Sequence, residues 1–161
     1  MATLVNSIWL DPGDWLNLSF RLFLAMLIGG AIGLNRQITG KAAGLRTHML
    51  VSLGAALFVI VTLTDGSTNS DALSRAVQGV ATGVGFLGAG EIIQLSRLSG
   101  GKPKVKGLTS AASIWTTAAL GMVAACGLWQ VAILGTLLVL LILSGAKSLE
   151  RFIPLWRDDD D

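Results

Sequence analysis

The sequence is poor in charged residues, which make up 14% of its 161 residues. Soluble globular domains contain about 25%, so this scarcity excludes an ordinary soluble domain. Hydrophobic residues account for 52% of the chain, and its mean hydropathy is +0.67. These values predict a membrane protein, and the length predicts a single domain.

The chain has one cysteine and one histidine, and this scarcity excludes several kinds of chemistry. Cys126 cannot form an internal disulfide, and its apolar surroundings favour a buried, unreactive thiol. No pair of carboxylates and no nucleophile–base pair is evident, so we expect no enzymatic activity. The first 20 residues contain Asp11 and Asp14 but no lysine or arginine, which argues against a cleavable signal peptide.

Long runs of apolar residues make up most of the sequence. A membrane-spanning helix needs about 20 mostly apolar residues, and five stretches meet or nearly meet this length: 16–34, 47–64, 76–96, 107–127 and 128–146. The short join between the last two predicts a tight helical hairpin. We therefore expect an all-α fold, a polytopic membrane helical bundle of about five transmembrane helices within residues 1–152. Residues 153–161 are expected to form a short cytoplasmic tail, whose aspartates 158–161 are assigned no function, whether native or added for expression.

Lysines and arginines gather in alternate connections. Those that follow the first, third and fifth spans are Arg36, Lys41, Arg46, Arg97, Lys102, Lys104, Lys106, Lys147, Arg151 and Arg157. Because positive loops stay on the cytoplasmic side, this pattern predicts the N-terminus outside and the C-terminus inside. Trp15 and Trp129 are expected at the outer interface and Trp156 at the inner one. The basic segment 99–106 is expected to set topology and to attract anionic lipid headgroups.

The third stretch contains glycines at the spacing G-x-G-x-x-G, at Gly83, Gly85 and Gly88. A dinucleotide-binding turn with this spacing follows a strand, opens a helix and is followed about 20 residues later by an acid. Here the glycines lie inside an apolar run, and position 108, where the acid would be expected after Gly88, is leucine. The spacing is therefore not a nucleotide site, and we expect neither nucleotide nor nucleic acid among the partners.

These glycines predict helix packing instead, because small residues let helix backbones approach closely in lipid. At 100° per residue, one side of the third span carries Gly79, Gly83 and Gly90, and another carries Ala81, Gly85 and Gly88. This arrangement predicts that the third span is central. The first span has a similar small-residue face, formed by Gly29 and Gly33. The fourth span adds hydroxyl groups able to bond to its own helix or to a neighbour: Thr109, Ser110, Ser113, Thr116 and Thr117.

Ionisable groups inside the membrane are costly and are therefore candidate functional residues. Arg21 is expected to reach the outer interface or to pair with Asp65 or Asp71. Asp71 and Arg75 have the i, i+4 spacing of a helix-supporting ion pair at the start of the third span.

Glu91 has two open interpretations. It either reaches towards the inner basic loops, or it has a specific role as a cation or proton site or as a partner of Arg36 or Arg46. His48, beside Arg46 and Thr47, is expected at the interface, with a role as metal ligand as the alternative.

A magnesium site requires several oxygen ligands, usually including carboxylates. One chain offers only Glu91 within the membrane, with neutral oxygens from Asn35, Gln78, Thr82 and Gln94. No cofactor is evident beyond Mg²⁺ as a ligand or transported ion. If a metal site exists, Glu91 is its best candidate, and two Glu91 side chains meeting in a dimer would strengthen it.

Three ordered motifs resemble the signatures of the MgtC/SapB family of bacterial inner-membrane proteins. They are GLNRQITGKAAGLRTHMLVSLGAALF at 33–58, RAVQGVATGVGFLGAGEII at 75–93 and VKGLTSAASIWTTAALGMVAACG at 105–127. The resemblance implies about five spans in the inner membrane with the N-terminus outside. Two departures matter: Asn35 stands where many relatives have an acid, and Glu91 stands where they have an apolar residue. Some relatives also carry a cytosolic C-terminal regulatory domain, which is expected to be absent here.

The resemblance implies a role in magnesium homeostasis and in adaptation to low magnesium and acid stress. The best-known member of the family regulates other membrane proteins, including the F-type ATP synthase. We therefore expect a regulator that lies in the lipid bilayer as a homodimer or other homo-oligomer and contacts such partners or transporters. The alternative is a transporter or channel for Mg²⁺ or another divalent cation.

Overall fold

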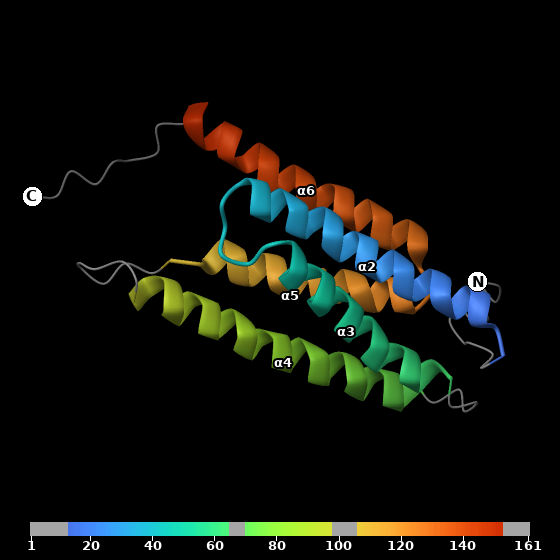
Figure 1. Cartoon of the computed structure of the whole chain (residues 1–161). Helices are drawn as coiled ribbons and strands as arrows, with labels where there is room; N and C mark the ends of the chain where they lie inside the picture. Colours follow the sequence, from blue (N-terminus) through green and yellow to red (C-terminus); the bar gives the residue numbers. More distant parts are fainter. Residues whose placement is uncertain (1–12, 65–69, 98–105, 153–161) are drawn as a thin grey trace, which may run out of the picture.

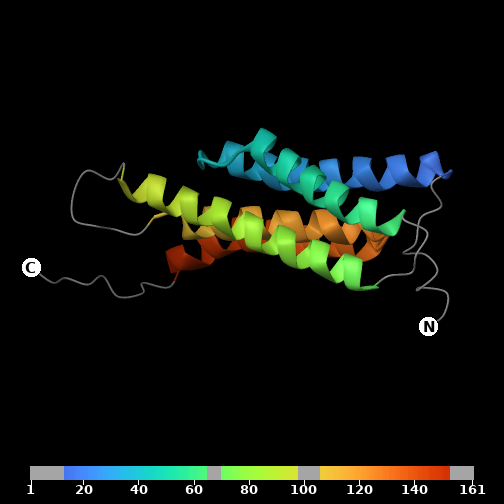
Figure 2. The ribbon, with the colours of Figure 1, turned by 90° about the horizontal axis from the view of Figure 1, so that it is seen from below.

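The computed structural model describes residues 13–64, 70–97 and 106–152 of the chain. This part folds into five helices: α2 (Trp15–Ile38), α3 (Leu45–Leu63), α4 (Ser70–Arg97), α5 (Leu108–Ala125) and α6 (Trp129–Phe152). They run roughly along a common direction and form an elongated bundle (Figures 1 and 2). The predicted all-α helical bundle is therefore confirmed. Trp156 and the tail 153–161 lie outside the described residues.

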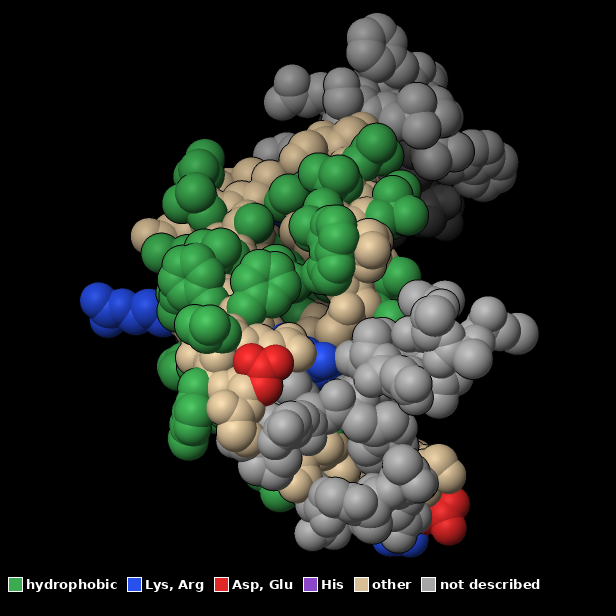
Figure 3. All heavy atoms as spheres, turned by 90° about the vertical axis from the view of Figure 1, so that its right-hand side faces the viewer, with side chains coloured by type: hydrophobic (Ala, Val, Ile, Leu, Met, Phe, Trp, Pro, Cys, Tyr) green, Lys and Arg blue, Asp and Glu red, His purple; other side chains and the backbone are tan. Residues whose placement is uncertain are grey.

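Four of these helices are long and apolar enough to cross a membrane: Trp15–Ile38, Leu45–Leu63, Ser70–Gln94 and Leu108–Ala125. A shorter apolar segment, Trp129–Gly145, forms most of α6. Viewed from the end where α2, α4 and α6 begin, hydrophobic side chains cover much of the described surface (Figure 3). A water-soluble bundle would expose polar side chains on its outer faces, so this surface is suited to lipid.

Local sequence sets the helix ends. Asp14 caps the start of α2, where its carboxylate accepts a hydrogen bond from the Asn17 amide at 3.1 Å. Gly127, in the left-handed region at φ 76°, reverses the chain between α5 and α6. The predicted tight hairpin is therefore confirmed.

Helix α5 occupies the centre of the bundle. It contacts α2, α3, α4 and α6, and 56% of its most apolar stretch is buried. Helix α4 lies along one edge (Figure 1), contacts only α3 and α5 among the described helices, and has 11% of its most apolar stretch buried. The prediction that the third span is central is therefore wrong. Small residues on several sides of α4 did not identify a helix surrounded by neighbours in its own chain.

Close packing occurs at other glycines. A methyl group at Gly29 would clash with the backbone carbonyl of His48, and one at Gly33 would lie 2.8 Å from the Cα atom of Leu45. These contacts hold α2 against the start of α3, so the predicted packing role of both glycines is confirmed. Gly121 of α5 lies against the Ser52 backbone in the same way.

The α4 glycines differ from these. Gly88 packs against Ala111, where an added Cβ would lie 3.2 Å from the alanine Cβ, as predicted. Four others have no atom within 4 Å of an added Cβ: Gly79, Gly83, Gly85 and Gly90. For these four glycines, the prediction of close packing against another helix of the same chain is wrong. Gly79 and Gly83 line an open groove, and Gly85 and Gly90 have no other described helix against them.

Candidate functional site

A buried row of polar side chains runs through the interior of the bundle, beginning at Arg36 near the end of α2. Arg36 is only 3% exposed, and its Nη2 donates a hydrogen bond to the Ser110 hydroxyl of α5. The Nε of Arg36 is also buried but has no hydrogen-bond partner among the described residues. The guanidinium therefore links α2 to α5 while one of its donors stays unused.

His48 continues this row from the first turn of α3. Its ring is fully buried, with Nδ1 3.0 Å from the Gly44 carbonyl and Nε2 3.2 Å from the Ser113 hydroxyl. A carbonyl oxygen only accepts, so Nδ1 carries a hydrogen. The Ser113 hydroxyl lies within reach of both Nε2 and the Ser110 carbonyl, the latter at 2.8 Å. His48 thus lies inside the bundle, where its nitrogens serve helix packing.

Ser52 joins three helices one turn further along α3. Its hydroxyl donates to the Ala25 carbonyl of α2 at 2.7 Å, and its backbone lies against Gly121 of α5. Thr117 is fully buried nearby along α5 and donates to the Ser113 carbonyl at 2.7 Å. The interior hydroxyls are therefore occupied by protein partners.

Arg21 serves the opposite end of the bundle. It is 2% exposed, its Nη1 donates to the Ala125 carbonyl at 2.8 Å, and its Nε donates to Asn17 at 3.1 Å. Ala125 is the last residue of α5, where carbonyls lack intrahelical partners and the helix dipole is negative. Arg21 therefore caps α5, a role that the sequence did not reveal.

The neighbouring Cys126 lies between α5 and α6 and is half-buried. Burial raises the pKa of its thiol above the ordinary 9.0, while the positive charge of Arg21 acts in the opposite direction. A thiol with a raised pKa is mostly protonated at neutral pH and therefore a poor nucleophile. The geometry is consistent with the unreactive cysteine expected from the sequence.

Glu91 lies near the C-terminal end of α4 and is half-buried. It is close enough to act electrostatically on Arg36, one of the two arginines that the pairing interpretation names. Its Oε1 is buried without a hydrogen-bond partner among the described residues. The nearby positive charge of Arg36 opposes the binding of a cation at this carboxylate.

Of the neutral oxygens proposed to assist Glu91, only that of Gln94 belongs to the same turn of α4, where Gln94 is exposed, and the other three lie elsewhere. Asn35 donates to the Ser144 hydroxyl of α6 at 3.0 Å. Gln78 and Thr82 are exposed on α4, where Gln78 donates to Ser74 at 3.2 Å and Thr82 donates to the Gln78 carbonyl at 2.9 Å. At 1.5 Å per residue, Gln78 lies about 20 Å from Glu91 along the helix. The structure therefore does not assemble these candidates into one site.

The remaining candidates lie near helix ends. Arg46 and Thr47 are exposed in the first turn of α3, and Thr109 is exposed in the first turn of α5. Asp71 lies in the first turn of α4, where its charge favours the helix dipole. Arg75, one turn later, is exposed as well.

Magnesium does not fit the described residues of a single chain. No group of three or more His, Cys, Asp or Glu side chains lies together in the described ranges. Glu91, the carboxylate that acts on the buried row within the described ranges, has the cationic Arg36 as a neighbour. Since Mg²⁺ is bound through carboxylates in near-octahedral geometry, this arrangement does not supply a resident metal site.

Sequence reasoning missed Ser52, Lys41 and Gly121. Ser52 shares the spacing of four residues with His48 and Ala56, which marks the buried side of α3. That signal was available, but a lone serine in a long apolar run does not reveal its partner. Lys41 contributes to a pocket only because the α2–α3 connection returns to the start of α5.

The fold and its apolar surface define an α-helical membrane protein, and comparison with known proteins then narrows the class. The family model described as the MgtC family matches residues 22–152. The chain therefore belongs to the MgtC family, and the resemblance in its three motifs is confirmed. No solved structure matches it significantly.

Three relatives show how similarity is distributed. Protein SrpB of Synechococcus elongatus is 57% identical over 153 residues, which cover 91% of this chain and 84% of SrpB. The putative magnesium transporter YhiD of Escherichia coli is 45% identical over 130 residues, covering 76% of this chain and 57% of YhiD. Protein MgtC of Salmonella typhimurium is 37% identical over 119 residues, which cover 74% of this chain and 48% of MgtC. The chain thus spans most of SrpB but about half of YhiD and MgtC.

Proposed function

We propose that the chain is a multi-pass protein of the bacterial inner membrane that serves magnesium homeostasis by contacting partner membrane proteins. Adaptation to low magnesium and acid stress would be its physiological setting, as the family resemblance implies. YhiD, whose printed name is putative magnesium transporter, supports the connection with magnesium. Two features support contact with partners rather than passage of the ion: the open glycine face of α4 and the buried polar row.

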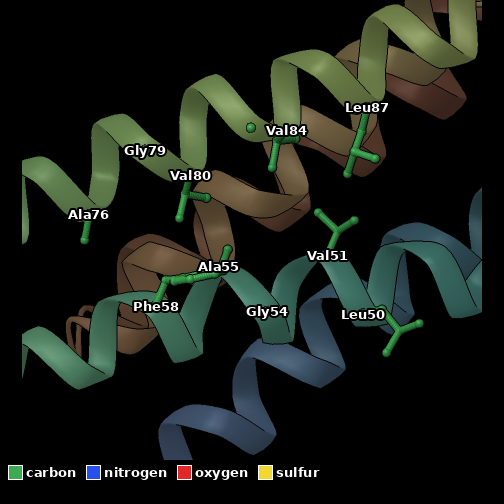
Figure 4. Close-up of a pocket in the computed structure, with 11 residues that line it drawn as sticks. Leu50, Val51, Gly54, Ala55, Phe58, Ala76, Gly79, Val80, Val84 and Leu87 are labelled. Atoms are coloured by element: carbon green, nitrogen blue, oxygen red, sulfur yellow. The ribbon is translucent and has the colours of Figure 1, made fainter.

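The observation that carries this proposal is the open glycine face of α4. Gly79 and Gly83 line an apolar groove of about 540 Å³ between α3 and α4, and Gly54 lines it from the α3 side (Figure 4). None of these three glycines has an atom within 4 Å of an added Cβ. In lipid, such small-residue faces drive association by letting a second helix approach closely.

The occupant we propose for this groove is α4 of a second copy, which would make the protein a homodimer. The same Gly79 and Gly83 face would be present on both copies, as a two-fold symmetric contact requires. Contacts with other membrane proteins, such as the F-type ATP synthase or transporters, would then use the faces that the dimer leaves open.

The buried polar row argues against a pathway for the ion. Apart from the Nε of Arg36, its side chains are bonded to protein partners, as the Arg36–Ser110 and His48–Ser113 contacts illustrate. Residues lining an ion pathway would instead present oxygens to the passing ion. This supports contact with partners over transport.

Disulfide crosslinking tests the homodimer. Gly79→Cys in a Cys126→Ser background should form a crosslinked dimer in native membranes. Gly83→Leu should prevent it, because a bulky side chain fills the groove. Gly145→Leu on α6 is the matched control, since Gly145 also has open space around it. A dimer unaffected by Gly83→Leu, or equally lost in Gly145→Leu, would place the contact elsewhere.

Transport through Glu91 is the second candidate, favoured by its buried oxygen without a partner. Pure protein in liposomes containing a magnesium-sensitive dye distinguishes the two functions. We expect no uptake above that of empty liposomes. Uptake that is lost in Glu91→Gln would support the transporter and contradict the proposed regulator.

A further inference from the structure

A second pocket lies where α2 ends and α5 begins, and none of its lining residues lines the α3–α4 groove. Figure 1 shows these two helix ends at the same end of the bundle. Its volume is about 480 Å³. The charged residues that line it are all cations, namely Arg36, Lys41 and Lys106. An open pocket with three positive charges and no lining carboxylate is suited to an anion.

The start of α5 forms one wall of this pocket. Helix α5 begins after Gly107, which adopts the left-handed region at φ 95° and has no side chain to cap the first turn. The first amides of a helix have no intrahelical acceptor, and the helix dipole makes this end positive. Helix starts of this kind bind phosphate and related anions through their backbone N–H groups.

Arg36 supplies an independent sign of a missing acceptor. Its side chain lines the pocket while being 3% exposed, and its Nε has no hydrogen-bond partner in the described part of the chain. A buried charged donor without an acceptor is costly, so such groups are normally satisfied. Glu91 attracts Arg36 electrostatically, yet among the described residues its own buried Oε1 lacks a partner, and Glu91 does not line this pocket.

We propose that this pocket binds a phosphate group that carries net negative charge, either on a lipid headgroup or as free inorganic phosphate. The Arg36 guanidinium, the Lys41 and Lys106 ammonium groups and the first amides of α5 surround the pocket with donors. The hydroxyls of Thr109 and Ser110 add donors at the same wall. A tetrahedral phosphate accepts several such charge-assisted hydrogen bonds at once.

The two phosphate sources are distinguished by two measurements on the full chain. In the first, the unfolding midpoint in dodecyl maltoside is followed as sodium phosphate replaces sodium chloride at constant ionic strength. Ligand that binds the folded state raises the midpoint. In the second, the protein is extracted from phosphatidylglycerol or phosphatidylcholine nanodiscs, and the retained lipid is counted by native mass spectrometry. A response to phosphate assigns the free anion, and retention of phosphatidylglycerol alone assigns the headgroup.

Three variants make either measurement decisive without removing the buried arginine. Lys41→Gln should weaken binding about tenfold, as expected for one lost charge-assisted contact. Thr109→Glu should abolish binding, because its carboxylate occupies the helix start, while the favourable interaction with the dipole preserves the fold. Arg46→Gln is the matched control, since Arg46 is an exposed cation at the same end that lines a different pocket.

Arg46→Gln should leave binding within about twofold of the unmodified chain, because Arg46 does not line this pocket and its exposed charge is screened by salt. Binding in neither measurement would overturn the proposal. So would binding that survives Thr109→Glu, or a loss in Arg46→Gln equal to that in Lys41→Gln.

Discussion

Replacing Gly121 with alanine is expected to destabilise the bundle at its centre. The new methyl group would clash with the carbonyl oxygen of Ser52 and would lie 2.8 Å from its hydroxyl oxygen. Neither oxygen can move freely, because the carbonyl belongs to the backbone of α3 and the hydroxyl is bonded to the Ala25 carbonyl. Helix α5 must therefore move away from α3, and this movement would disturb contacts with α2 as well.

The magnitude follows from three terms. Forcing an extra methyl group into close-packed structure costs about 1–3 kcal/mol, and straining the Ser52 hydrogen bond adds about 1 kcal/mol. The higher helix propensity of alanine offsets up to about 1 kcal/mol. We therefore expect Gly121→Ala to lower the free energy of unfolding by about 1–3 kcal/mol. Gly145→Ala, which lies outside the proposed dimer contact and meets no neighbouring atom among the described residues, should leave it unchanged or raise it by up to about 1 kcal/mol.

Titration of the detergent-solubilised protein with sodium dodecyl sulfate, followed by tryptophan fluorescence, measures both variants. The comparison uses the same chemical change at two sites, so the intrinsic preference of alanine for helices cancels. If Gly121→Ala proved as stable as Gly145→Ala, the close approach of α3 and α5 would be incorrect.

Three further predictions concern the polar contacts. His48→Ala should cost about 2–4 kcal/mol, because it removes a fully buried ring, whereas Ser113→Ala should cost about 1 kcal/mol; equal losses in the same titration would contradict the packing role. Arg21→Leu should cost about 1–3 kcal/mol by uncapping α5, and a similar loss in the exposed control Arg75→Leu would refute the cap. Cys126 should react slowly with iodoacetamide at pH 7 and faster towards pH 10, since burial raises the pKa of its thiol; a rate already at its plateau at pH 7 would disagree.

The sequence allowed the fold to be predicted well because the membrane restricts the choices. Apolar runs of spanning length must form helices whose backbone groups bond internally, so the predicted span 47–64 corresponds closely to α3, Leu45–Leu63. Packing order was harder to predict. Gly83 and Gly121 look alike in sequence, yet only the spatial neighbour determines which one permits close contact. The partner of Arg21, a carbonyl 104 residues away, had no sequence signal.

The order of the helices along the chain has a consequence for assembly. Helices α2 and α3 are made first and already fit together through Gly29 and Gly33. Helix α4 follows, but one of its two neighbours is α5, which enters the membrane after it. During synthesis α4 must therefore remain beside the α2–α3 pair with part of its contact surface in lipid. Insertion of α5 then covers faces of α2, α3 and α4 together, and α6 follows against α2 and α5. Until α5 is inserted, the faces that these three helices turn towards it are open to the bilayer.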